Sequence, residues 1–102
     1  MCTTIGQALD VATSAKAHGR NGPRGKGLAR AIALASTSAE MKTIAERAVD
    51  LADNGKADNA YNRGTDLCTS ASEARAIEAS AQARGRTKAA SYAATKAVAL
   101  GG

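Results

Sequence analysis

Residues 68–100, CTSASEARAIEASAQARGRTKAASYAATKAVAL, resemble residues 2–34, CTTIGQALDVATSAKAHGRNGPRGKGLARAIAL, when the chain is shifted by 66 residues without a gap. The identical pairs run from Cys2 and Cys68 to Leu34 and Leu100. A shift of half that length aligns the middle of the chain more weakly, matching Thr37, Gly55 and Leu67 to Thr4, Gly22 and Leu34. We therefore divide the single domain 1–102 into three units, 2–34, 35–67 and 68–100. A period of 33 residues is typical of stacked helical hairpins.

Composition favours the same architecture. The hydrophobic fraction is 44%, but the chain has two Tyr, no Phe, no Trp and one Pro. A β-sandwich or barrel needs aromatic and β-branched strands, which are scarce here, whereas Ala-rich sequences favour helices. No apolar run approaches the length of a membrane span, and no secretory pattern opens the sequence. We predict an all-α fold of about six short helices in three stacked antiparallel hairpins, with a thin core.

Each unit begins with a helix-start signal. A Thr or Ser is followed three residues later by Glu in Thr37–Glu40 and Ser70–Glu73, which are capping boxes, and by Gln in the weaker pair Thr4–Gln7. Apolar residues then recur at spacings of three and four, which predicts a first helix with one buried face. The predicted core positions are Ala8, Val11 and Ala15; Met41, Ile44, Ala48 and Leu51; and Ala74, Ile77 and Ala81. Gly19, Gly55 and Gly85 are expected to end these helices or open the turns.

The second helix of each unit carries two small residues and a Leu at spacings of four and three. These triplets are Gly27, Ala31 and Leu34; Ala60, Gly64 and Leu67; and Ala93, Ala97 and Leu100. The pattern predicts close approach to a neighbouring backbone. Gly64 should weaken the middle helix by about 1 kcal/mol relative to Ala. Residues 18–27, with Pro23 and four glycines, are expected to form a long mobile turn.

Unit two resembles a tetratricopeptide repeat. Ala48, Leu51, Gly55 and Ala60 stand at the spacing of that family's small residue, large first-helix residue, turn glycine and second-helix alanine. The resemblance implies a short helical solenoid that binds other proteins, and it carries over no individual binding residue.

Residues 69–100 are also similar to the two-helix half of ribbon-helix-helix DNA-binding proteins. That resemblance implies a strand ahead of the helices, for which 65–69 is the candidate, and a dimer that reads the major groove. The candidate strand has one acidic residue and no Arg or Lys. Base contacts depend mostly on basic or amide side chains, so this composition argues against direct readout.

The net charge of +5 lies mainly at the two ends of the chain, whereas the middle third is slightly acidic. Two predicted turns are rich in basic residues, which could contact a phosphate or an acidic partner, or simply form a solvated edge. These residues are Arg20, Arg24, Lys26, Arg84, Arg86 and Lys88. The first turn is not a phosphate-binding P-loop, because Arg20 stands at its first glycine position and Gly27 at its Ser/Thr position.

No arrangement of residues predicts catalysis, a cofactor or a metal site. His18 has no acid, Ser or Cys nearby in the pattern of a catalytic site. Cys2 and Cys68 lack the further ligands that zinc requires. They share one position two units apart, which is too far for a disulfide in a stacked array.

We therefore expect a non-enzymatic structural or protein-interaction protein. Its thin core, its ends without polar caps and its nearly uncharged last helix (89–100) predict burial against another copy or a protein partner, by contacts that can propagate into rings or filaments. The residues expected at such an interface are Tyr61, Tyr92, Val98 and Leu100. The alternative is a small basic regulator or accessory factor that binds DNA or RNA. No membrane partner is expected.

Overall fold

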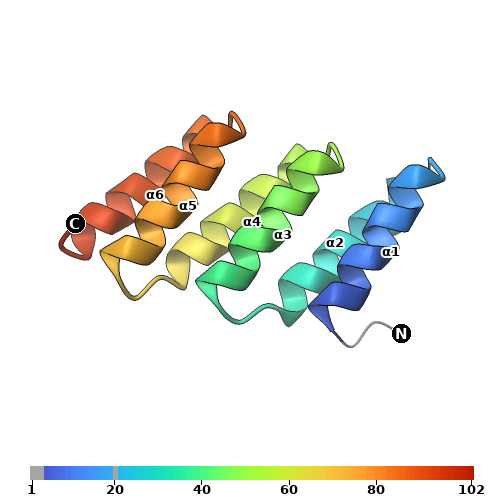
Figure 1. The fold of residues 1–102 in the computed structure, drawn as a ribbon, viewed down its shortest axis with the longest axis horizontal. Helices are drawn as coiled ribbons and strands as arrows, with labels where there is room; N and C mark the ends of the chain where they lie inside the picture. Colours follow the sequence, from blue (N-terminus) through green and yellow to red (C-terminus); the bar gives the residue numbers. More distant parts are fainter. Residues whose placement is uncertain (1–3, 20) are drawn as a thin grey trace.

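The structure is a computed structural model that describes residues 4–19 and 21–102, in which all the regular secondary structure is helical. Its helices are α1 (Ile5–Ala17), α2 (Asn21–Leu34), α3 (Ser38–Asp50), α4 (Asn54–Asp66), α5 (Ala71–Ala83) and α6 (Thr87–Ala99). They pair as three antiparallel hairpins, α1–α2, α3–α4 and α5–α6, which lie side by side (Figure 1). The predicted all-α fold of three stacked hairpins is confirmed. The first helices begin at intervals of 33 residues, at Ile5, Ser38 and Ala71.

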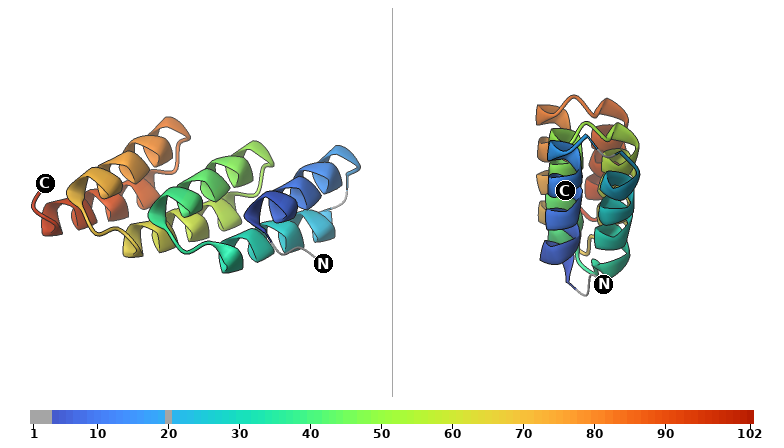
Figure 2. Two further views of the ribbon diagram at one scale, coloured as in Figure 1. Left: turned by 60° about the horizontal axis from the view of Figure 1, so that its bottom comes forward. Right: turned by 90° about the vertical axis from the view of Figure 1, so that its right-hand side faces the viewer.

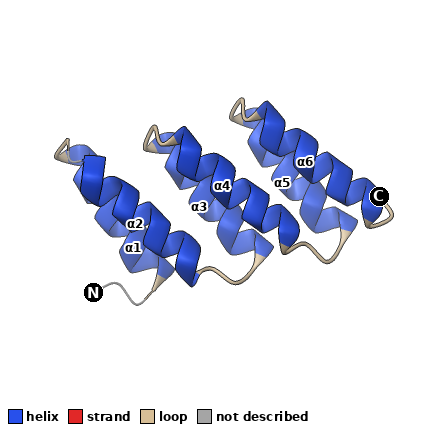
Figure 3. Cartoon of the chain, turned by 180° about the vertical axis from the view of Figure 1, so that it is seen from behind, coloured by secondary structure: helices blue, strands red, loops and turns tan. Residues whose placement is uncertain are grey.

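The hairpins form two layers of helices. Helices α1, α3 and α5 make one layer and α2, α4 and α6 make the other, as the end-on view and the view from behind show (Figures 2 and 3). Helix α5 contacts both helices of the preceding hairpin, and α6 contacts α4. The molecule measures 43 × 26 × 13 Å, so it is a slab two helices thick. Its core is the thin seam between the layers.

Side-chain caps fix where the first helices begin. The Thr37 hydroxyl accepts from the Glu40 backbone N–H at 3.1 Å, and the Glu40 carboxylate accepts from the Thr37 N–H at 3.1 Å. Ser70 and Glu73 repeat this capping box with distances of 3.3 and 3.2 Å. Backbone N–H groups, chiefly that of Ser36 for Glu40 and that of Thr69 for Glu73, hold the pKa of each carboxyl below its usual value. Thr4 likewise caps α1 by accepting from the Gln7 N–H. The predicted helix starts are confirmed.

The ends of the first helices are only partly as expected. Gly19 and Gly85 adopt left-handed backbone, with φ of 68° and 73°. In the second hairpin the residue with left-handed backbone is Ala52, with φ of 61°. The prediction that Gly55 ends the first helix or opens the turn is therefore wrong. Gly55 lies inside α4, because Asp53 accepts from the Lys56 N–H and starts the helix ahead of it.

The same hydrogen bonds close α3 and α5. The N–H of Asp53 donates to the carbonyl of Ala48 at 2.9 Å, and the N–H of Arg86 donates to that of Ala81 at 2.8 Å. This six-residue closure is the Schellman motif, which requires left-handed backbone at the residue before the donor. The motif therefore forms in both hairpins, although only the third supplies the glycine that it favours.

Two further expectations from the sequence are wrong. Residues 18–27 are not a long turn, because α2 begins at Asn21. Pro23 lies in the first turn of α2, where backbone N–H groups have no helical acceptor. The N–H that proline lacks would therefore make no helical hydrogen bond at this position. The candidate strand 65–69 is instead the end of α4 and the connection to α5.

Small residues allow the helices to approach closely, as predicted. A Cβ atom added at Gly27 would lie 2.9 Å from both the Ala12 nitrogen and the Ala8 oxygen of α1. At Gly64 it would lie 2.9 Å from the Met41 Cβ and 3.1 Å from the Ile77 Cδ1. Gly64 thus stands where α3, α4 and α5 meet, and this close packing offsets its low helix propensity.

Replacing Ala52 with Gly should stabilise the protein. Ala52 is exposed, so the change removes little packing and mainly relieves left-handed strain of about 1–2 kcal/mol. Glycine loses about 0.5–1 kcal/mol more backbone entropy on folding, which leaves a net gain of about 0.5–1 kcal/mol. Thermal unfolding followed by circular dichroism should show a midpoint raised by a few degrees.

The matched control is Gly85→Ala, at the equivalent position of the third hairpin. A Cβ added there would lie within 4 Å of no other atom, so the substitution changes stability only through the left-handed backbone conformation. This variant should unfold at a lower temperature than the wild type. Equal midpoints for Ala52→Gly and the wild type would contradict the account of both helix ends.

Candidate interaction surfaces

The basic residues predicted in the first turn do not lie together in a loop. Arg20 is outside the described residues, and Arg24 and Lys26 belong to α2. The Arg24 guanidinium donates to the Leu51 carbonyl at the end of α3, at 3.1 Å, while its Nε is buried without a hydrogen-bond partner. Lys26 is exposed. Arg24 therefore joins the first two hairpins, and Lys26 faces solvent.

The basic residues of the third hairpin also have protein partners. Arg86 donates two hydrogen bonds to the Asp58 carboxylate, at 2.8 and 2.7 Å. Arg84 lies 3.9 Å from Glu46 of α3. Lys88 is exposed and lines a shallow hollow between α4 and α6 with Tyr92. Arg84 and Arg86 thus connect the third hairpin to both helices of the second.

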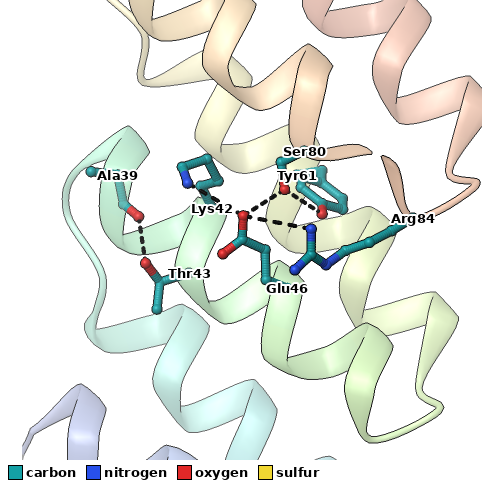
Figure 4. A network of polar contacts seen from close by, with 7 residues as sticks. All are labelled: Ala39, Lys42, Thr43, Glu46, Tyr61, Ser80 and Arg84. Carbon is teal, nitrogen blue, oxygen red and sulfur yellow. Dashed lines mark hydrogen bonds and ion pairs between the residues drawn. The ribbon is translucent and has the colours of Figure 1, made fainter. Parts of the chain in front are cut away.

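A chain of hydrogen bonds fixes the second hairpin against the third (Figure 4). Tyr61 is fully buried, and its hydroxyl is 2.8 Å from the Ser80 hydroxyl. Ser80 in turn donates to Glu46 at 2.7 Å, so the proton of the Tyr61 hydroxyl points toward Ser80. Lys42 completes the group, with its ammonium 3.3 Å from Glu46. The Glu46 carboxylate of α3 is therefore joined to α5 directly, through Ser80, and to α4 through the hydroxyls of Ser80 and Tyr61.

The environment of this network shifts two pKa values in opposite directions. Burial raises the pKa of Tyr61. Burial also opposes the charge of Glu46, but the hydrogen bond from Ser80 and the nearby Lys42 and Arg84 outweigh it and lower the Glu46 pKa. Folding therefore favours the ionised form of Glu46.

The first layer has the same register at both contacts between hairpins. Arg47 of α3 donates to the Thr13 hydroxyl of α1 at 3.1 Å, and Ser80 of α5 donates to Glu46 of α3. Each pair is separated by 34 residues. Sequence reasoning did not identify these residues. The signal that could have found them is a polar pair recurring at this separation.

Two valines are exposed at positions that are buried elsewhere in the molecule. Val11 was predicted in the core but is 43% exposed, whereas Ile44 and Ile77 at the equivalent positions are buried. Val98 is 65% exposed, whereas Ile32 and Thr65 at its equivalent positions are buried. The difference arises because a preceding hairpin covers the first of these positions in α3 and α5. A following hairpin covers the second position in α2 and α4.

The valines mark two surfaces. The N-terminal end face includes first-hairpin residues at positions that contact a preceding hairpin elsewhere: Val11, Ser14, His18 and Lys26, the last of which is equivalent to Tyr92. The C-terminal end face includes third-hairpin residues at positions that contact a following hairpin elsewhere: Arg75, Ala79, Ser91, Ala94, Val98 and Ala99. The charged members of the two faces, Lys26 and Arg75, are both exposed.

Of the other predicted interface residues, Tyr61 is buried between the second and third hairpins. Tyr92 is 46% exposed and donates a hydrogen bond to Asp66, which raises the pKa of Tyr92. Leu100 is half-buried and packs against the core. Only Val98 of the four lies on an end face.

Charge divides between the two layers. Helices α2, α4 and α6 carry seven basic and two acidic residues, whereas α1, α3 and α5 carry four basic and six acidic residues. Three basic residues occupy one position on successive second helices, namely Arg30, Arg63 and Lys96. The excess positive charge therefore lies on one broad side of the slab, which Figure 3 shows from the front.

The remaining residues considered in the sequence are His18 and the two cysteines. His18 Nδ1 lies 2.8 Å from the Ser14 carbonyl of its own helix. Cys68 is buried, donates to the Gly64 carbonyl and has its pKa raised by burial, while Cys2 lies outside the described residues. No group of three His, Cys, Asp or Glu residues in 4–19 and 21–102 is placed to hold a metal ion.

None of the six described helices combines the length and the apolar character that a membrane span requires. The chain matches no family model, no curated protein and no solved structure.

Replacing Glu46 with Gln should destabilise the protein in a pH-dependent way. Because folding lowers the Glu46 pKa, its carboxylate stabilises the native state above about pH 4.5, and this contribution disappears as the pH falls through the lowered value. The variant should lose about 1 kcal/mol at neutral pH, the usual scale for a hydrogen bond to a charged group at a partly exposed site. Chemical unfolding at pH 7 and at pH 3 should show the difference from the wild type shrinking in acid.

The control is Asp10→Asn, which removes an exposed carboxylate from α1. Its stability should stay close to that of the wild type at both pH values. A Glu46→Gln deficit that is equally large at pH 3 would contradict the role given to the carboxylate charge.

Proposed function

We propose that the protein is a non-enzymatic helical-repeat protein that binds protein surfaces and associates with further copies of itself. One observation carries the proposal: the exposure of Val11 and Val98 at positions that are buried wherever a neighbouring hairpin is present. A protein partner would remove both side chains from water. The equal spacing of the helix starts and the recurring small residues support the interpretation as repeats, and with it the resemblance to tetratricopeptide-like modules.

The expected association is reversible. Full burial of one valine contributes about 1.5–3 kcal/mol, before the entropy lost on association is subtracted. The rest of each end face is small, polar or charged, and adds little apolar area. A stable complex generally buries more than about 1,000 Å² in total. We therefore expect an equilibrium that depends on concentration.

Multi-angle light scattering over a concentration series tests this proposal. The average mass of the wild type should rise from that of one chain at low micromolar concentration. Val98→Arg should keep the mass of one chain, because it places a charge on the C-terminal end face. Circular dichroism should show an unchanged helix content, since Val98 is mostly exposed.

The matched control is Thr95→Arg, which adds the same charge to the same helix. Ala29 and Asn62, at the equivalent positions of α2 and α4, remain exposed although another hairpin follows them. Position 95 therefore lies off the end face, and this variant should associate like the wild type. A wild type with the mass of one chain at every concentration would contradict the proposal.

A second candidate function is binding of DNA or RNA through the layer of second helices. The observation that favours it is the concentration of basic residues on α2, α4 and α6. Such a surface attracts phosphates without reading sequence. Arg24 and Arg86 contribute less than the sequence predicts, because both contact other hairpins.

Fluorescence anisotropy with a labelled random-sequence duplex and single strand tests this second candidate. Affinity should fall steeply as salt increases, because bound counterions are released when lysines and arginines replace them. Lys88→Glu should weaken binding several-fold more than Lys16→Glu, which makes the same charge change on the opposite layer. No binding at low salt, or equal effects of both variants, would exclude the basic layer as a nucleic-acid surface.

A further inference from the structure

We infer that copies of the chain join head to tail in the register of its own hairpins, so that α1 of one copy packs on the C-terminal end face of the next. This inference rests on the proposed self-association and specifies its geometry. Helix α1 would take the place on the third hairpin that α5 takes on the second. The 33-residue spacing of the hairpins would then continue across the junction.

The apolar contact at the junction is one that the molecule already contains. Ile77 of α5 reaches α4 at Gly64, next to the buried Thr65. The equivalent residues at the junction are Val11 of one copy and Ala97 and Val98 of the other. Valine is smaller than isoleucine by one methylene, so Val11 has room beside the added methyl of Ala97. Both exposed valines would become buried by the same contact.

The polar groups also match across the junction. Ser14 is equivalent to Ser80, and in this register it would face Ala79 and Ala94, which are equivalent to Glu46 and Tyr61. The centre of this contact buries no full charge, because Val11, Ser14, Ala79 and Ala94 are small or neutral, and the charged residues Lys26 and Arg75 are both exposed. The hydrogen-bond network of the second and third hairpins is missing, however. Junctions between copies are therefore weaker than those within a chain, and they form and break reversibly.

The polarity of the contact determines the type of assembly. Each copy uses one face to bind the copy before it and a different face to bind the copy after it. Such heterologous contacts give open chains, or rings where the rotation between copies closes. A two-fold dimer would instead pair one end face with itself. Two variants with opposite faces blocked distinguish these arrangements.

The experiment compares Val11→Arg, Val98→Arg and an equimolar mixture of both by light scattering. Each variant alone should keep the mass of one chain, because one of its two faces is blocked. The mixture should reach the mass of two chains and no more, because the intact N-terminal end face of Val98→Arg binds the intact C-terminal end face of Val11→Arg. The wild type at the same concentration should form larger species.

The outcomes separate this inference from the proposed function. A wild type that stays at the mass of one chain would contradict the proposed self-association. A wild type that associates while the mixture does not would leave self-association standing and overturn the head-to-tail geometry. The geometry would also be overturned if either variant alone associated like the wild type.

A gain of affinity tests the register itself. The double change Ala79→Glu and Ala94→Tyr would place the network of Glu46 and Tyr61 opposite Ser14 of the next copy. Arg75, at the position equivalent to Lys42, would flank the new carboxylate. We expect association to tighten about tenfold, the scale of one or two added hydrogen bonds to a charged group.

Adding Ser14→Ala to this double variant provides the control. Ser14 is exposed, so its loss should not affect folding. The added affinity should disappear with the hydroxyl. A gain that survives Ser14→Ala, or no gain at all, would show that the copies do not meet in this register.

Discussion

The fold depends on how closely two helices of a hairpin can approach. At Gly27 the backbones of α1 and α2 leave no room for a methyl group, and Ala60 and Ala93 occupy the equivalent buried positions of the other hairpins. Dispersion contacts between backbones and small side chains are individually weak but numerous, and they replace the large apolar side chains that the sequence lacks. The cost is a thin core. Stability then depends on contacts between hairpins, and any end without a neighbour exposes apolar surface.

The polar contacts between hairpins align each hairpin with its neighbour, and they are not the main source of stability. Apolar faces made largely of alanine resemble one another at every turn, so a hairpin could slide along its neighbour with little loss of packing. The pairs Arg47–Thr13 and Ser80–Glu46 select one position along the helices, because a shift by one turn would separate the partners. The salt bridge between Arg86 and Asp58 does the same for the second layer.

The capping boxes predicted the helix starts because their signal is local. A hydroxyl and a Glu three residues apart act on the same helix turn, whatever packs around them. The sequence was misleading where tertiary context decides. Gly55 looked like a helix end, but Asp53 starts α4 ahead of it and left-handed backbone falls on Ala52. Val11 matched the pattern of a core residue, yet burial at that position requires a preceding hairpin.

Each hairpin at an end of the slab has one neighbour, which has a consequence for local unfolding. The third hairpin is tied to the second by the Ser80 network and by Arg86, and the first hairpin is tied to the second by Arg47–Thr13 and Arg24–Leu51. Proteins open locally in cooperative segments. Local opening of the first hairpin would uncover Ile44 on the second hairpin, and so create a surface equivalent to the N-terminal end face that carries Val11.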